Sequence, residues 1–186
     1  MSHEKLTIVD GAAAGLIRGS GAAEAAQANG YYTVECRDAG GNLKWTDDIH
    51  NLVTTGGKND LLDKYLAGSA YTAAWFMGLI GATSYTTGPA AGDTAASHGG
   101  WVEDQNYSQA SRPTAAFSAA SAGSKALSSA LTFSVNATTT IKGCFLIANA
   151  TKGGTTGILY SAGLFTGGDK VLANGDTLSV SYTASV

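Results

Sequence analysis

Apolar and polar residues alternate along the last third of the chain, and this pattern limits the fold more than any other feature. Residues 131–135, 139–147 and 178–183 each follow it. Alternation of period two is typical of antiparallel strands that bury one face of a sheet. Gly-rich turns, such as Asn174-Gly175-Asp176, separate these segments. The C-terminal third therefore predicts an antiparallel sheet.

Strand patterns also occur earlier in the chain. Residues 31–36 and 43–47 flank a Gly/Asn turn and predict a β-hairpin, with 49–54 extending its second strand after a kink. The most apolar run, 73–80, predicts a strand buried on both faces. Further short strands are expected at 114–117, 156–161 and 170–172, and residues 118–125 are expected to form a loop. Around eight to ten short strands predict an all-β, antiparallel jelly roll or β-sandwich.

One short helix is predicted at about 59–67. Its stripe of Leu61, Leu62, Tyr65 and Leu66 lies on one helical face, which we expect to pack on a sheet. Asn59 or Asp60 is the expected cap, residues 55–59 are the expected break before the helix, and Gly68 is expected to end it in a left-handed conformation.

The first thirty residues differ from the rest, because they are rich in Ala and Gly and carry few large side chains. The sequence predicts an N-terminal arm at 1–30 and one β-sandwich (jelly-roll) domain at 31–186. Two interpretations of the arm stay open: an unordered terminus, or a segment that orders against a neighbouring subunit. In the second case its anchors are Leu6, Ile8, Val9, Leu16 and Ile17.

Charged residues make up only 13% of the chain, with a net charge of −3. A chain with so little surface charge is expected to hide part of its surface in an assembly. The 11 Lys and Arg residues are scattered singly, so no nucleic-acid partner is expected. The chain contains no run of about 18 apolar residues, and its first residues do not resemble a signal peptide, so no membrane partner is expected. Cys36 and Cys144 are expected to be free, buried thiols.

Three residues match the types found in a hydrolytic triad: Asp93, Ser97 and His98. A Ser and a His adjacent in sequence rarely face one substrate, and the G-x-S-x-G nucleophile elbow is absent. We therefore expect structural roles: Asp93 or Thr94 caps a helical turn, His98 bonds locally, and the following glycines let Trp101 fold back onto the core. His50 follows two aspartates but lacks metal-ligand spacing. The sequence predicts no catalytic residue, metal or cofactor.

The aromatic residues allow two interpretations. Trp45, Trp75 and Trp101, with Tyr31 and Tyr32, either form a sugar-binding platform or belong to the core. Burial is the more common fate of large aromatic side chains.

Several segments, in order, resemble a family of structural proteins from the virions of tailed bacteriophages, the capsid cement (decoration) proteins. They are residues 37–45, 51–59, 74–80, 93–103, 107–113 and 175–178. The resemblance implies a jelly-roll protein on the outer surface of the head, made in the bacterial host cytoplasm. Its partners would be the major capsid protein and further copies of itself, as a dimer or trimer. Asp93, His98, Trp101 and Arg112 match the family pattern as structural residues, and the family supplies no catalytic residue.

Two alternatives remain at this stage. The first is another virion component, such as a tail, neck or fibre-tip protein, with glycan binding as an option for the tip. The second is a small β-fold hydrolase that uses Asp93, Ser97 and His98. The first expectation is a non-enzymatic protein that stabilises contacts between capsid subunits.

Overall fold

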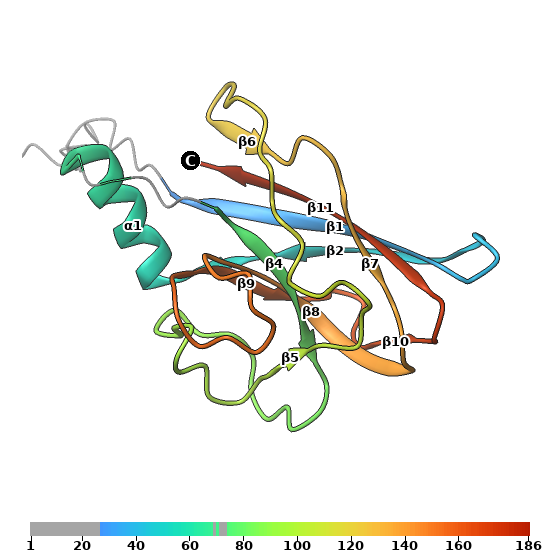
Figure 1. Cartoon of the computed structure of the whole chain (residues 1–186). Helices are drawn as coiled ribbons and strands as arrows, with labels where there is room; N and C mark the ends of the chain where they lie inside the picture. Colours follow the sequence, from blue (N-terminus) through green and yellow to red (C-terminus); the bar gives the residue numbers. More distant parts are fainter. Residues whose placement is uncertain (1–26, 69, 71–73) are drawn as a thin grey trace, which may run out of the picture.

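The computed structural model of the protein describes residues 27–68, 70 and 74–186 (Figure 1). Two antiparallel sheets pack face to face and one helix lies at an end of the sandwich, which confirms the predicted all-β class with a short helix. The predicted arm anchors lie outside the described residues.

The two sheets have different strand orders. Sheet A has the order β2-β1-β11, with β6 and β7 both paired to β11, and sheet B has the order β3-β9-β8-β4-β5, with β10 paired to β8. The strands of sheet A are β1 (Asn29–Arg37), β2 (Leu43–His50), β6 (Ser124–Ala126), β7 (Leu131–Ser134) and β11 (Thr177–Ser185). Those of sheet B are β3 (Leu52–Val53), β4 (Phe76–Gly81), β5 (Glu103–Asp104), β8 (Thr139–Ile147), β9 (Leu159–Leu164) and β10 (Lys170–Leu172).

The predicted hairpin is present as β1 and β2. Asp38 closes its turn, because its Oδ1 atom accepts hydrogen bonds from the backbone N–H groups of Gly40 and Asn42, both at 2.9 Å. β1 begins at Asn29, so the last two residues of the predicted arm belong to the sheet. The chain changes sheets at Asn51, where β2 ends and β3 begins to pair with β9.

The main core lies between the sheets. Alternate residues of β1 and β11, among them Val34 and Val180, are fully buried against apolar residues of sheet B. Polar bonds cross this core: the Tyr32 hydroxyl lies 2.9 Å from Ser161 Oγ, and Asn51 Nδ2 donates to the Tyr182 hydroxyl at 3.0 Å. Burial raises the pKa of both tyrosines, so both hydroxyl groups remain neutral at physiological pH.

The helix α1 (Thr55–Leu66) begins four residues earlier than predicted. The predicted break at 55–59 is wrong, because Thr54 acts as the cap and its hydroxyl accepts a hydrogen bond from Gly57 N at 3.0 Å. Gly57 also brings the first turn against β9, since a Cβ there would lie 2.5 Å from the Tyr160 carbonyl oxygen. The predicted end is confirmed, with Ala67 as the C-cap and Gly68 at a φ of +65°.

The predicted packing of the helix stripe is wrong. Leu62, Tyr65 and Leu66 are 55%, 88% and 74% exposed, and Leu61 is 39% exposed. The buried residues of α1 are instead Gly57 and Asp60. The cause is geometric: α1 contacts β9 through its small N-terminal residues, and its C-terminal half extends past the end of the sandwich (Figure 1).

Two smaller corrections concern the segment between β5 and β7. The strand predicted at 114–117 forms only isolated bridges, from Thr114 to Phe76 and from Phe117 to Leu127. The loop predicted at 118–125 contains the start of β6. Both segments lie at the edges of sheets, where pairing with a neighbour decides whether a strand forms and the local pattern says little.

Candidate interaction surface

The outer face of sheet B is covered, unlike that of a typical antiparallel sheet. Strands β4, β8 and β9 are buried on both faces, as predicted for the run at 73–80. A second apolar cluster joins Ile80, Phe145, Ile147 and Leu159 of the sheet to Ala95 and Trp101. These last two residues belong to the cover segment, our name for residues 82–113.

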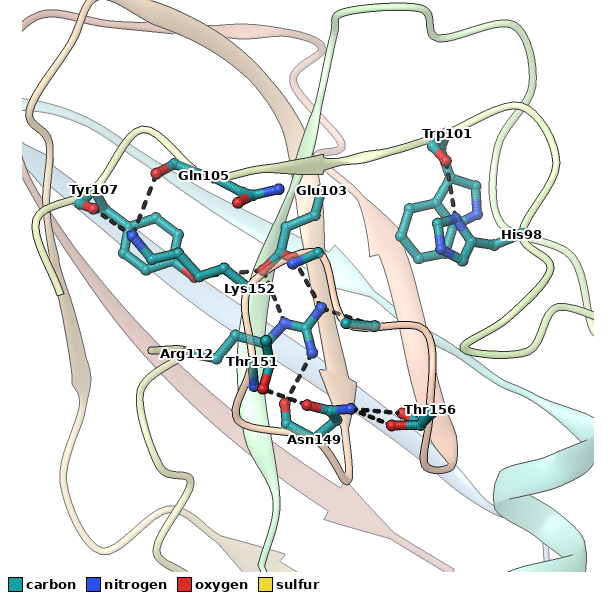
Figure 2. A network of polar contacts seen from close by, with 12 residues as sticks. His98, Trp101, Glu103, Gln105, Tyr107, Arg112, Asn149, Thr151, Lys152 and Thr156 are labelled. Carbon is teal, nitrogen blue, oxygen red and sulfur yellow. Dashed lines mark hydrogen bonds and ion pairs between the residues drawn. The ribbon is translucent and has the colours of Figure 1, made fainter. Parts of the chain in front are cut away.

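The family-pattern residues fold the cover segment onto sheet B. Asp93 Oδ2 accepts hydrogen bonds from Trp101 Nε1 at 2.8 Å and from Ala90 N at 3.0 Å. The His98 ring stacks on Trp101 with centroids 4.2 Å apart, and its Nδ1 atom lies 2.9 Å from the Trp101 carbonyl oxygen (Figure 2). Gly100 has a φ of +103°, which favours glycine. The predicted return of Trp101 to the core is confirmed, since it is 2% exposed.

Arg112 anchors the C-terminal end of the cover segment. Its Nε and Nη2 atoms donate to the two carboxylate oxygens of Glu103, both at 2.8 Å, and Nη1 donates to the Asn149 carbonyl at 2.8 Å (Figure 2). The two side chains of the pair are 2% and 5% exposed. The guanidinium also lies 5.3 Å from the centroid of the Phe145 ring. A bidentate pair with further hydrogen bonds is the arrangement that best offsets the desolvation of two buried charges.

Loop 149–154 extends this network. Glu103 also accepts a hydrogen bond from Gly153 N. Lys152 donates from Nζ to the Tyr107 carbonyl at 2.6 Å and lies 3.8 Å from the centroid of the Tyr107 ring. Burial lowers the pKa of Lys152, and burial beside Glu103 raises that of Tyr107. Sequence reasoning missed Asn149 and Lys152, because their partners lie about 40 residues away in the chain and no local pattern marks them.

A cavity of about 250 Å³ lies beneath this network, between Trp101, Arg112, Phe145 and Leu159. Its lining is mostly apolar, and the charged groups at its wall, Glu103 and Arg112, already satisfy one another. The polar side chains of His98, Gln105 and Thr155 also line the cavity.

The residues of the proposed hydrolytic triad point to other partners. Asp93 and His98 both bond to Trp101, as described above. Ser97 pairs with Thr94 in a turn, where Ser97 N donates to Thr94 Oγ1 at 3.0 Å. The predicted cap is thus present at Thr94, but it closes a turn and not a helical turn. In the described part of the chain, no group of three or more His, Cys, Asp or Glu side chains is placed to hold a metal ion.

The five aromatic residues considered for a sugar platform do not share one surface. Tyr32 and Trp101 are buried, and the partly buried Trp45 packs edge-to-face against Phe165. Trp75 makes an edge-to-face contact with Tyr160 in the main cluster. Tyr31, at 48% exposure, is the one that is most open to solvent.

The outer face of sheet A is bare and rich in hydroxyl groups. Its cross-strand rows are set by the pairing of β2, β1, β11 and β7. The outward hydroxyl residues are Tyr31, Thr33, Thr46, Thr132, Ser134, Thr177, Ser179, Ser181 and Thr183. Glu35 and Arg37 form an ion pair with each other at 2.6 Å on this face. Asp48, opposite Thr33 on β2, adds a further carboxylate to this face.

Neither the family models nor the curated proteins searched contain a match to this chain. The described residues include no helix that is long and apolar enough to cross a bilayer.

Proposed function

We propose that this protein is a capsid cement (decoration) protein of a tailed bacteriophage, which docks on the outside of the head and holds neighbouring major capsid subunits together. The outer face of sheet A is the main support for this proposal. It is the broad face of the sandwich that the described residues leave uncovered, and short hydroxyl side chains dominate it. The resemblance of the motif segments to cement proteins agrees with it.

Such a face suits protein contact for two physical reasons. Ser and Thr side chains lose little rotamer freedom when buried, whereas Lys, Arg or Glu each lose about 1.5–2 kcal/mol of side-chain entropy. Charged residues are also depleted from the centres of protein interfaces, because their desolvation is costly. Ser181, Thr33 and Ser179 occupy the middle of this face, next to one another on β1 and β11.

Modest affinity per copy is sufficient for this role. A subunit that contacts two capsid subunits at once links them, and repetition over the shell multiplies the effect. The sandwich, with one core between the sheets and another beneath the cover segment, is a stiff body for such a link.

The test is cosedimentation of the purified protein with expanded, otherwise bare phage heads, followed by cryo-electron microscopy of the pellet. We expect ordered density at regular positions on the shell, with sheet A toward it. Ser181→Arg, in the middle of the face, is expected to weaken binding at least tenfold. Ala96→Arg, exposed on the cover segment, is the matched control and is expected to bind like wild type.

Absence of binding to heads contradicts the proposal and redirects the search to the tail or neck of the virion. Binding that Ala96→Arg abolishes and Ser181→Arg spares would place the contact on the covered side instead.

A further inference from the structure

The helix end of the molecule exposes apolar side chains that the fold does not use. Five of the nine large, exposed apolar residues in the described chain lie there: Leu61, Leu62, Tyr65 and Leu66 of α1, and Val186 after β11. Single exposed apolar residues are ordinary, but a cluster of this kind marks a contact site.

A groove of about 310 Å³ continues this surface between α1 and the end of the sandwich. We call it the end groove. Its lining is overwhelmingly apolar and includes Leu61, Trp75, Phe117, Tyr182 and Val186. Among the described residues that line the groove, Lys125 is the one with a charged side chain. An apolar segment that carries little charge therefore fits it best.

The N-terminal segment enters the fold at the rim of this groove. Asn29 pairs with Ser185 and Gly30 with Ala184, and both of these partners line the end groove. Ala28 packs against the main core. The chain N-terminal to Asn29 is therefore attached to the sandwich at the rim of the end groove.

We propose that the end groove and the exposed stripe of α1 are the docking site for residues 6–17 of the same chain. This segment contains two apolar groups, Leu6-Thr7-Ile8-Val9 and Leu16-Ile17, with small residues between them. Its only charged residue is Asp10, which suits an apolar surface beside Lys125. The contact uses a surface separate from the outer face of sheet A, so it does not depend on the capsid proposal.

The length of the connection favours the chain's own segment over that of a second copy. Ten mostly small residues, 18–27, separate this segment from Ala28. Ten residues reach at most roughly 36 Å when extended, and a coil of that length spans about 17 Å on average. A short flexible tether holds its end at an effective concentration in the millimolar range. At micromolar protein concentration, a second copy competes poorly with a tethered segment.

The experiment is cysteine cross-linking in the full-length protein without phage heads. Ile17→Cys is combined with Leu62→Cys and treated with a short bismaleimide, while the native Cys36 and Cys144 are buried. We expect an internal cross-link in most monomers, identified by mass spectrometry of the linked peptides. The control pairs Ile17→Cys with Val171→Cys, which is 62% exposed on β10, at the other end of the sandwich (Figure 1). We expect it to react at least tenfold less.

Cross-links that join two chains would overturn the proposal and assign the groove to a second copy. Equal reaction of both pairs, or no reaction, would overturn it as well. A second readout uses Leu16→Ser with Ile17→Ser. We expect this variant to bind an apolar fluorescent dye several-fold more strongly than wild type, because the groove is uncovered, and unchanged dye binding would contradict docking. Neither measurement involves heads, so either result leaves the capsid proposal to its own test.

Discussion

The outer faces of the two sheets differ: that of sheet B is covered, and that of sheet A is exposed to solvent. Sheet B carries apolar residues on its outer face and buries them beneath the cover segment, which Trp101 and Arg112 hold in place. Sheet A carries hydroxyl residues on its outer face and leaves them in solvent. The motif residues Asp93, His98, Trp101 and Arg112 are thus used for internal packing, and the uncovered outer face is the one that carries mainly hydroxyl side chains.

The difference separates stability from binding within one small domain. On the covered face, polar groups are buried and their loss leaves an unpaired partner, which is costly. On the bare face, each polar group exchanges readily with water, and its loss costs little in the free protein. Mutations on the two faces are therefore expected to affect different measurements.

The largest expected difference in stability is between the buried and the exposed Arg–Glu pair. Arg112→Ala leaves Glu103 buried and unpaired, so we expect a loss of about 3–5 kcal/mol in the free energy of unfolding. Arg37→Ala breaks the exposed pair with Glu35 and is expected to cost less than about 1 kcal/mol. Urea denaturation of both variants measures the contrast. Equal losses would mean that the cover segment is not held by its buried charges.

Two aromatic variants, one on each outer face, compare the faces through a smaller expected change in stability. Trp101→Phe removes the hydrogen bond to Asp93 and part of the ring that packs near Phe145, so we expect a loss of about 2 kcal/mol. Tyr31→Phe, on the bare face, is expected to change stability by less than about 0.5 kcal/mol. Thermal unfolding followed by circular dichroism distinguishes them. A Tyr31 effect as large as that of Trp101 would show that sheet A's outer face also supports the fold.

A pH-dependent link joins the two sheets at Asp47. This β2 residue accepts hydrogen bonds from Thr166 Oγ1 at 2.7 Å and Gly167 N at 3.0 Å, and pairs with Lys170 at 2.7 Å. Burial alone raises the pKa of Asp47, but the hydrogen bonds from Lys170 and Thr166 outweigh burial and leave it below the ordinary value.

Because the folded-state pKa of Asp47 is lowered, its carboxylate stabilises the fold above the unfolded-state pKa of about 3.9. This contribution is lost as the pH falls through the lower, folded-state pKa. We expect Asp47→Asn to cost about 1 kcal/mol at pH 7 and to match wild type near pH 2. Urea denaturation across this pH range measures the difference, and a gap that stays constant with pH would contradict it.

The smallest effect on stability is expected on the bare face itself. Thr132→Lys places a long charged side chain next to Ser179 at the edge of the hydroxyl rows. We expect the free energy of unfolding to change by less than about 0.5 kcal/mol, while binding to heads falls. A variant that unfolds more easily but binds as before would reverse the roles assigned to the two faces.

Sequence patterns predicted the strands well where alternation was clear. β8 has the predicted bounds, and β1, β2, β7 and β11 agree within a few residues. These strands are predictable because burial of one face imposes a local period of two. The predicted end of α1 was right. Its predicted start was wrong, because Gly56 and Gly57 stand where a helix would normally be interrupted. Here Gly57 is required for the contact with Tyr160.

The outward stripe of α1 shows the limit of local patterns. Leu61, Leu62, Tyr65 and Leu66 have the spacing of a buried helical face, but spacing does not identify the surface that a face meets. The ion pair of Glu103 and Arg112 could not be predicted from local patterns either, since its contribution to stability depends on burial under a loop from another part of the chain. Such contacts join residues that are distant in sequence.

The sequence by itself determined the all-β class, the short helix and the low surface charge, because each depends on local periodicity or on composition. The tertiary structure alone decided which sheet face is covered, which apolar residues stay exposed and where the motif residues bond. These outcomes depend on how the two sheets, the cover segment and α1 meet in space. That arrangement is set by the sum of many long-range contacts, and no single segment of the chain encodes it.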